Sequence, residues 1–282
     1  MKIRFNISKD ALKVLKVGQK AKLLIKLQHQ YPKFAIFVPP QRNMLSIYKK
    51  EIHQFFSSLT GYIAIIVFLA VCGLFLWIFD ENILDYGYAT LDKFFLFAPW
   101  VMLFLLPALT MRSFSDEFKS GTIEVLYTLP LKENDIILGK YLSALTFVVF
   151  ALIPTGLYVF TIYRLSGGNI DSGSIIGSYT GLLFLCAAFT AIGLFCSSLT
   201  NNQVAAFLIG VFVNFILYAG FESLSQLSLL GEGADYFISQ IGMQFHYNSI
   251  SRGVLDTRDL IYFLSILIIF LAATRLTLLK RR

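Results

Sequence analysis

The chain has 282 residues, of which 56% are hydrophobic, 16% aromatic and only 15% charged. Soluble domains typically carry about 25% charged residues and about 45–50% apolar ones. A soluble multidomain protein of this composition would leave most of its apolar surface without a place to be buried. The composition therefore indicates an integral membrane protein.

The net charge of +7 is distributed unevenly along the chain. Residues 1–57 hold twelve Lys and Arg but only two acids, Asp10 and Glu51. A basic tail can bind nucleic acid, but it also suits an anionic membrane surface or the cytoplasmic side of a membrane protein. Because a membrane domain follows, we favour the membrane interpretations and expect no nucleic-acid partner.

Six apolar stretches are long enough to cross a bilayer, which takes about 20 residues. The first begins near residue 60, beyond the reach of a signal peptide, so we expect a retained span. The fourth and fifth are separated only by Thr-Asn-Asn-Gln at 200–203, which must be a turn because the two together exceed one crossing. The stretches are residues 60–79, 94–111, 141–163, 175–199, 204–221 and 260–279.

The distribution of Lys and Arg predicts the orientation. One side holds twenty of them, counting the N-terminal segment, residues 112–140 and the C-terminus, and the other side holds four. Cytoplasmic loops carry the excess of Lys and Arg. We therefore expect a multi-pass protein with both termini in the cytoplasm.

A polar segment, DEFKSGTIEVLYTLP at 116–130, lies between the second and third spans. Residues 112–140 contain nine charges, and each would cost about 2.5–3.5 kcal/mol at mid-bilayer. The segment therefore lies in cytoplasmic water or against a protein partner. It is either an ordinary amphipathic loop on the bilayer or a rigid knob that docks on a cytosolic partner.

The same segment predicts two short helices separated by a break at Gly121, because glycine costs about 1 kcal/mol in a helix interior. Thr122 can cap the second helix and Pro130 ends it. A new helix is expected to begin near Asn134 and to run through Lys140 into the third span. An apolar stripe is expected at Phe114, Phe118, Thr122, Val125 and Leu129, with Asp116, Glu117, Lys119 and Glu124 mostly facing elsewhere.

Sequence signatures of ATP binding, metal-dependent catalysis and ion coupling are weak. No Walker A motif occurs, and His29, His53 and His246 form no HExxH pattern. The first five spans contain no Asp, Glu, Lys, Arg or His between their ends, which argues against an ion-coupled carrier. We interpret Cys72, Cys186 and Cys196 as buried hydrophobes because each falls in an apolar stretch.

Two further features indicate helix packing. The fourth span carries small residues that permit close approach of a neighbouring helix. These are Ala187, Ala188, Ala191, Gly193 and Ser197. The stretch 222–259 is apolar for a loop, and its short runs, divided by Gly231 and Gly233, suit outer half-helices rather than a span.

Four stretches carry a resemblance to a known family. They are YKKEIHQFF (48–56), APWVMLFLLPALTMRSFSDEFKSGTIEVLYTLP (98–130), ILGKYL (137–142) and SISRGVLDTRDLIYF (249–263). On these residues the chain from Met44 to its end resembles the membrane subunit of ABC-2 type transporters. Within that family it is most similar to the gliding-motility-associated permease of Bacteroidota.

The resemblance implies an all-α membrane protein with six spans, an amphipathic cytoplasmic helix before the first span and a coupling helix between the second and third. It also implies a cytosolic ATPase partner that binds ATP and Mg, a second permease half, and no cofactor in this chain. The coupling helix would contact the ATPase through Glu117, Gly121, Thr122, Glu124 and Leu126. The amphipathic helix would lie on the inner membrane surface with Tyr48, Lys49, Lys50, Glu51, Phe55 and Phe56.

We therefore expect residues 44–282 to be a non-enzymatic permease domain of an exporter in the bacterial inner membrane, surrounded by lipid. The alternative is a membrane scaffold subunit of a motility or secretion machine, without a transport path. The sequence reveals neither the substrate nor whether the second half is a copy of this chain. Residues 1–43 are expected to be a basic extension, either a miscalled translation start or a membrane-surface tail.

Overall fold

The computed structural model describes residues 44–79, 83, 90–124, 132–168, 170–226 and 234–281. The expected N-terminal extension at 1–43, parts of four connecting segments and residue 282 lie outside these residues. All regular structure in the described part of the chain is helical. The prediction of an all-α protein is therefore confirmed.

Six helical segments are long and apolar enough to cross a membrane, as the sequence predicts. Some are continuous helices and others are built from two or three pieces. The pieces are α4 (Leu59–Trp77), α6 (Asp92–Thr110) with α7 (Arg112–Lys119), α9 (Glu133–Leu152) with η1 (Ile153–Thr155) and α10 (Gly156–Leu165), α11 (Ser172–Leu199), α12 (Gln203–Phe215) with η2 (Ile216–Gly220) and α13 (Phe221–Ser225), and α16 (Thr257–Lys280).

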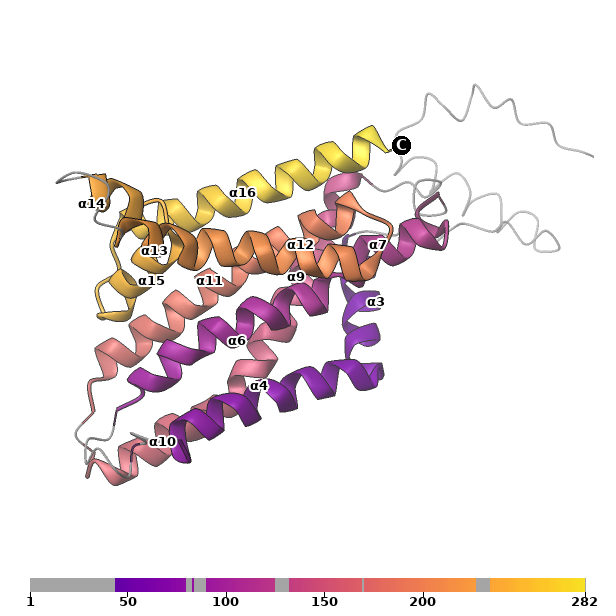
Figure 1. Ribbon diagram of the computed structural model, residues 1–282. Helices are drawn as coiled ribbons and strands as arrows, with labels where there is room; N and C mark the ends of the chain where they lie inside the picture. The colour runs from indigo at the N-terminus through magenta and orange to yellow at the C-terminus, as the bar shows by residue number, and fades with distance from the viewer. Residues whose placement is uncertain are drawn as a thin grey trace, which may run out of the picture. The chain divides into compact units, whose positions relative to one another are not determined.

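The fourth span, α11, is the centre of the bundle (Figure 1), where it contacts α6, α9, α12 and α16. The small residues that predicted close packing in this span are all buried or nearly so. At Gly193 the approach is very close, since a Cβ built there would lie 2.2 Å from Thr110 Oγ1 of α6. Side chains larger than hydrogen are therefore excluded at this crossing.

The turn between the fourth and fifth spans lies where the sequence predicts it. Helix α11 ends at Leu199, and α12 begins at Gln203 after its N-cap residue Asn202. The Asn202 side-chain oxygen accepts a hydrogen bond from the backbone N–H of Val204 at 2.9 Å. A polar N-cap satisfies a backbone donor that the helix itself leaves free.

Two irregular turns interrupt the spans. The third span passes through a 3₁₀ turn, Ile153–Thr155, that contains Pro154, because proline cannot supply the N–H of a regular α-helical turn. The fifth span contains a π-helical turn, Ile216–Gly220, which the sequence did not predict. Its Tyr218 is buried against Trp100 and Phe189.

Short helices close one end of the bundle, which we call the α15 end. They are α13, which ends the fifth span, and α14 (Ala234–Ser239) and α15 (Met243–Ser251), which confirm the expected half-helices between the fifth and sixth spans. Helix α15 packs tightly on α11, where a Cβ at Gly177 would lie 2.6 Å from the carbonyl oxygen of Ile250. Tyr247 of α15 donates a hydrogen bond to the carbonyl oxygen of Phe95 at 2.7 Å.

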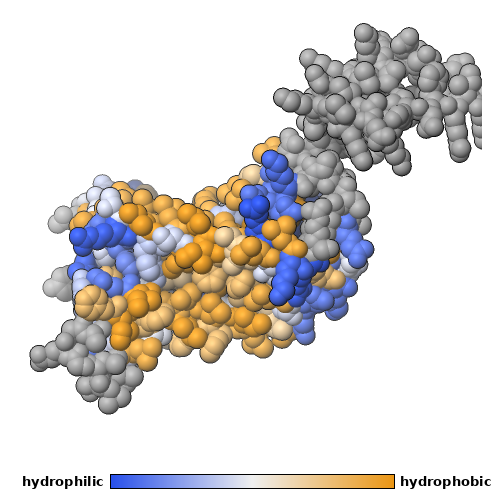
Figure 2. All heavy atoms as spheres, turned by 90° about the horizontal axis from the view of Figure 1, so that it is seen from above, coloured by the Kyte–Doolittle hydropathy of each residue, from blue (hydrophilic) through white to orange (hydrophobic). Residues whose placement is uncertain are grey.

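The opposite end, which we call the α7 end, is formed by α7, by α3 (Met44–Ser57), and by the ends of α11 and α16 (Figure 1). Figure 2 shows apolar side chains covering the middle of the visible face, with hydrophilic residues gathered toward both ends. An apolar belt between two polar ends is the surface that a bilayer selects. The most exposed spans are α4 and α16, and many of their large apolar side chains face outward.

The α6–α11 crossing predicts different effects for two glycine-to-alanine changes. In Gly193→Ala the new methyl group collides with Thr110, whose hydroxyl donates to the Leu106 carbonyl oxygen at 2.8 Å. Overpacking of this kind costs about 1–3 kcal/mol. Thermal unfolding of the purified protein in detergent should show a lowered melting temperature.

The matched control is Gly156→Ala, because nothing lies within 4 Å of a Cβ at Gly156. Its melting temperature should be unchanged or slightly raised, since alanine favours helix over glycine. Equal melting temperatures for the two variants would contradict the close crossing.

Candidate functional site

Helix α7 continues from the second span after a single turn residue, Met111, and ends at Ser120. Gly121 follows with a φ of +69°, a left-handed conformation that glycine adopts without steric cost. Residues 122–124 then form a further helical turn. The predicted break at Gly121 is therefore confirmed, whereas Val125, Leu126, Leu129 and Pro130 lie outside the described residues.

The start of α7 is held by a serine of the fourth span. Ser197 Oγ accepts hydrogen bonds from the backbone N–H groups of Phe114 at 3.0 Å and of Ser115 at 3.2 Å. The same hydroxyl donates to the carbonyl oxygen of Met111 at 2.9 Å. Ser197 is completely buried. Ser197 therefore satisfies, from another helix, the backbone N–H donors at the start of α7 that a capping side chain normally satisfies.

Two more helices hold the outer turns of α7. The side-chain amide of Gln203, at the start of α12, donates to Asp116 Oδ1. The guanidinium of Arg281, just past α16, lies 4.6 Å from the centre of the Phe118 ring. Arg281 also donates to Asn201 Oδ1 at 2.9 Å and to the carbonyl oxygen of Leu199. Each contact comes from a residue distant in sequence.

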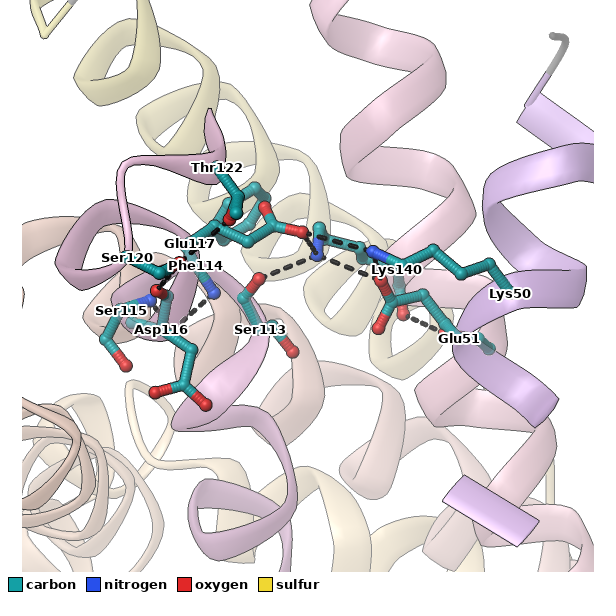
Figure 3. Close-up of polar contacts among 12 residues, drawn as sticks. Lys50, Glu51, Ser113, Phe114, Ser115, Asp116, Glu117, Ser120, Thr122 and Lys140 are labelled. Atoms are coloured by element: carbon teal, nitrogen blue, oxygen red, sulfur yellow. Dashed lines mark hydrogen bonds and ion pairs between the residues drawn. The ribbon is translucent and has the colours of Figure 1, made fainter. Parts of the chain in front are cut away.

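A buried ion cluster joins α7 to α3 and α9 (Figure 3). The ammonium of Lys140, in α9, lies 2.8 Å from Glu117 Oε1 of α7 and 3.0 Å from Glu51 Oε1 of α3. It also donates to the carbonyl oxygen of Ser113 at 2.7 Å. Only 2% of the Lys140 side chain is exposed, against 7% for Glu51 and 11% for Glu117. We call Glu51, Glu117 and Lys140 the Lys140 cluster.

The charges of the cluster are balanced by a second lysine at its edge. Lys50 Nζ lies 3.5 Å from Oε1 of both Glu51 and Glu117, but its side chain is 60% exposed. Two carboxylates therefore face two ammonium groups. Since an exposed ion pair contributes little and a buried charge must be paired, Lys140 is the cation on which the cluster depends.

The structure places the sequence-predicted contact residues in two groups. Gly121, Thr122 and Glu124 are exposed at the tip of the α7 excursion. Glu117 is buried at 8% exposure and points into the bundle, so the expectation that it faces away from the apolar stripe was wrong. The physical reason is Lys140, whose charge draws the carboxylate inward.

The residues predicted for the apolar stripe differ in how deeply they are buried. Phe114 is completely buried and Phe118 is half-buried, as expected, but Thr122 is exposed. Leu126, the fifth predicted contact residue, lies outside the described part of the chain. The role of all five toward a partner stays a prediction.

The six residues predicted for the amphipathic helix all lie in α3. Lys49 and Lys50 are exposed, while Tyr48, Phe55 and Phe56 are half-buried against the third span. Tyr48 is within 3.1 Å of Thr146 Oγ1, and Phe55 and Phe56 pack on Phe147 and Phe150 with ring centres 5.2–6.0 Å apart. Glu51 is the exception, because it belongs to the Lys140 cluster.

Sequence reasoning missed two buried polar contacts between helices. Lys140 was counted only as one of the cations flanking the third span. Its apolar neighbours at helical spacing, Ile136, Ile137 and Ala144, were a signal that this position faces the core. The second pair joins α15 to α16, where His246 Nδ1 lies 2.6 Å from Asp259 Oδ1 and the imidazole stacks on Tyr262 at 3.8 Å.

Among the described residues, no group of three His, Cys, Asp or Glu side chains could hold a metal ion. The three cysteines are buried and unpaired. What the α7 end does offer is a rigidly held helix with a short exposed tip.

Comparison with known proteins settles the family. The sequence model of a protein family, described as the ABC-2 family transporter protein, matches residues 41–279, which is most of the chain. The chain belongs to this family. It is thus a multi-pass membrane protein and a permease component, of a kind that generally pairs with an ABC ATPase and a second permease half. A search of the curated proteins found no match to the chain.

The Lys140 cluster predicts a large loss of stability for Lys140→Met. The change leaves Glu51 and Glu117 in a buried site without their main cation, and breaking a buried pair in this way costs about 3–5 kcal/mol. Thermal unfolding of the purified permease in detergent measures the effect.

Lys50→Met is the matched control, because Lys50 contacts the same two carboxylates from an exposed position. It should cost no more than about 1 kcal/mol. The triple variant Glu51→Gln, Glu117→Gln, Lys140→Met should recover part of the loss, since it removes every buried charge. Equal losses for the two lysine variants would contradict the assigned role of Lys140.

Proposed function

We propose that this chain is the permease subunit of an ABC exporter, driven by ATP hydrolysis in a separate cytosolic subunit. In this proposal α7 is the coupling helix and the exposed residues Gly121, Thr122 and Glu124 contact the ATPase. ATP and Mg bind to the partner, and this chain performs no chemistry. A second permease half, identical or different, completes the transport path.

One observation carries the proposal: α7 combines an exposed tip with an inner face held by five other helices. Its contacts run to α3 and α9 through the Lys140 cluster, to α11 through Ser197, to α12 through Gln203, and to the end of α16 through Arg281. A push on the tip therefore reaches the membrane-spanning helices directly. A loop lying loosely on the bilayer would not need these contacts.

The proposed location is the bacterial inner membrane, with the α7 end and both termini in the cytoplasm. The twenty-to-four division of Lys and Arg supports this orientation. The gliding-motility type is supported by the resemblance of SRGVLDTRD at 251–259 to that group. The structure adds that this stretch connects α15 to α16 at the opposite end from α7.

Labelling of engineered cysteines tests the orientation. Ser120 at the tip of α7 and Ser172 at the start of α11 are both exposed and belong to opposite ends of the bundle. A membrane-impermeant maleimide applied to whole spheroplasts should label Ser172→Cys and leave Ser120→Cys unlabelled until the membrane is opened. The native cysteines are buried and give a low background. The reverse pattern would overturn the orientation.

Charge reversal at the tip tests the coupling. Glu124→Lys in the permease co-purified with its ATPase should reduce transport-coupled ATP hydrolysis in vesicles about tenfold or more, because removing an interface charge pair costs about 2–5 kcal/mol. Membrane insertion should be unaffected, since Glu124 is exposed.

Asp92→Lys is the matched control, because Asp92 is an equally exposed acid at the far end of α6. It should leave coupled hydrolysis unchanged. Full coupling in Glu124→Lys, or failure of any ATPase to co-purify, would favour the alternative of a scaffold without a transport path.

A further inference from the structure

A cavity of about 630 Å³ opens beside the Lys140 cluster. It lies between α3, the first turns of α4, the end of α6, and α7. Sites for small organic ligands typically measure about 300–1,000 Å³. The cavity is therefore large enough for part of an organic ligand, and its two halves differ in chemistry.

The inner half of the cavity is apolar. Its walls include Ile63 and Val67 of α4 and Leu105 and Leu109 of α6. Ile63 is 48% exposed and Val67 45% exposed, so this half opens on the apolar belt of the bundle. The wall from Ser58 to Val67 runs about 14 Å along α4 at a rise of about 1.5 Å per residue. That length matches one leaflet, which is half of a hydrocarbon core about 30 Å thick.

The other half carries an unsatisfied acceptor. Glu117 Oε1 binds Lys140 and Lys50, but Oε2 of the same carboxylate is buried and has no hydrogen-bond partner among the described residues. Leaving a buried charged oxygen without a donor is costly. Glu117 lines the cavity, and a rotation of its carboxylate would bring this oxygen to the cavity surface. There it would accept from a ligand N–H or O–H group, and from a cationic donor most of all.

Two cationic side chains also line the cavity. Arg112 lines the cavity, is exposed, and makes no ion pair with any residue that the structure describes. Lys50 also lines the cavity and is 60% exposed. Guanidinium and ammonium groups at an accessible site favour a phosphate. The polar half thus offers an acceptor for a cation and cationic donors for an anion.

We propose that this cavity binds a phospholipid with a primary amine in its headgroup, of the phosphatidylethanolamine type. The ammonium donates to Glu117 Oε2, the phosphate binds Arg112 and Lys50, and one acyl chain lies along Ile63 and Val67. A choline headgroup has no N–H to donate, and a glycerol headgroup has no positive charge, so both fit less well. The placement in the cytoplasmic leaflet rests on the proposed function; the binding itself does not.

Native mass spectrometry of the purified full chain tests the proposal. The protein in detergent is titrated with dioleoyl phosphatidylethanolamine, phosphatidylcholine and phosphatidylglycerol of equal chain length. The ethanolamine lipid should bind about tenfold more tightly than either of the others, as expected for one hydrogen bond to a charged group. Equal binding of the three lipids, or binding of none, would overturn the proposal.

A pair of tryptophan variants locates the site. Val67→Trp fills the apolar half and should abolish the ethanolamine preference. Ile66→Trp is the matched control, because Ile66 is the adjacent residue of α4, is 63% exposed and does not line the cavity. Loss of the preference in both variants or in neither would contradict the assigned cavity. Neither lipid experiment needs an ATPase. Lipid binding can therefore be confirmed even if the coupling proposal is contradicted, and coupling can be confirmed even if lipid binding is contradicted.

Discussion

The organisation of the α7 end depends on one buried ammonium group. Lys140 lies in α9 almost without solvent, and its charge is tolerable only while Glu51 and Glu117 remain within hydrogen-bonding distance. The two carboxylates come from α3 and α7, so three helices cannot separate without exposing or isolating a charge. The ion cluster thus adds to the close packing of α3 on α9, where a Cβ at Gly139 would lie 3.0 Å from the Ile47 side chain.

This constraint bears on the proposed coupling role of α7. The tip of α7 is exposed, but its base is bound through Ser197 to α11, which packs against α6, α9, α12 and α16. The Lys140 cluster extends that connection to α3 and the third span. The amphipathic cavity lies beside the same cluster, so a lipid headgroup bound there would contact α3 and α7, of which α7 is the proposed coupling helix.

The sequence was sufficient to predict the features that depend on local pattern. Span lengths, the turn before Gln203, the break at Gly121 and the short helices of the α15 end follow from hydrophobic runs and from glycine and cap residues. The direction of the Glu117 side chain and the pairing of His246 with Asp259 could not be predicted this way. Each depends on a partner from another helix, and the composition of a single helix does not reveal which of its charges is buried.

Because Lys140 of α9 binds Glu117 of α7 and Glu51 of α3, we expect α7 and α3 to move as one body. Spin labels at Ser120, at the tip of α7, and at His53, on the exposed face of α3, measure the distance between the two helices by double electron–electron resonance in the reconstituted transporter. We expect a narrow distance distribution between the two labels that does not change between the nucleotide-free and ATP-bound states. A distribution that broadens or shifts with nucleotide, while Lys140 is intact, would contradict it.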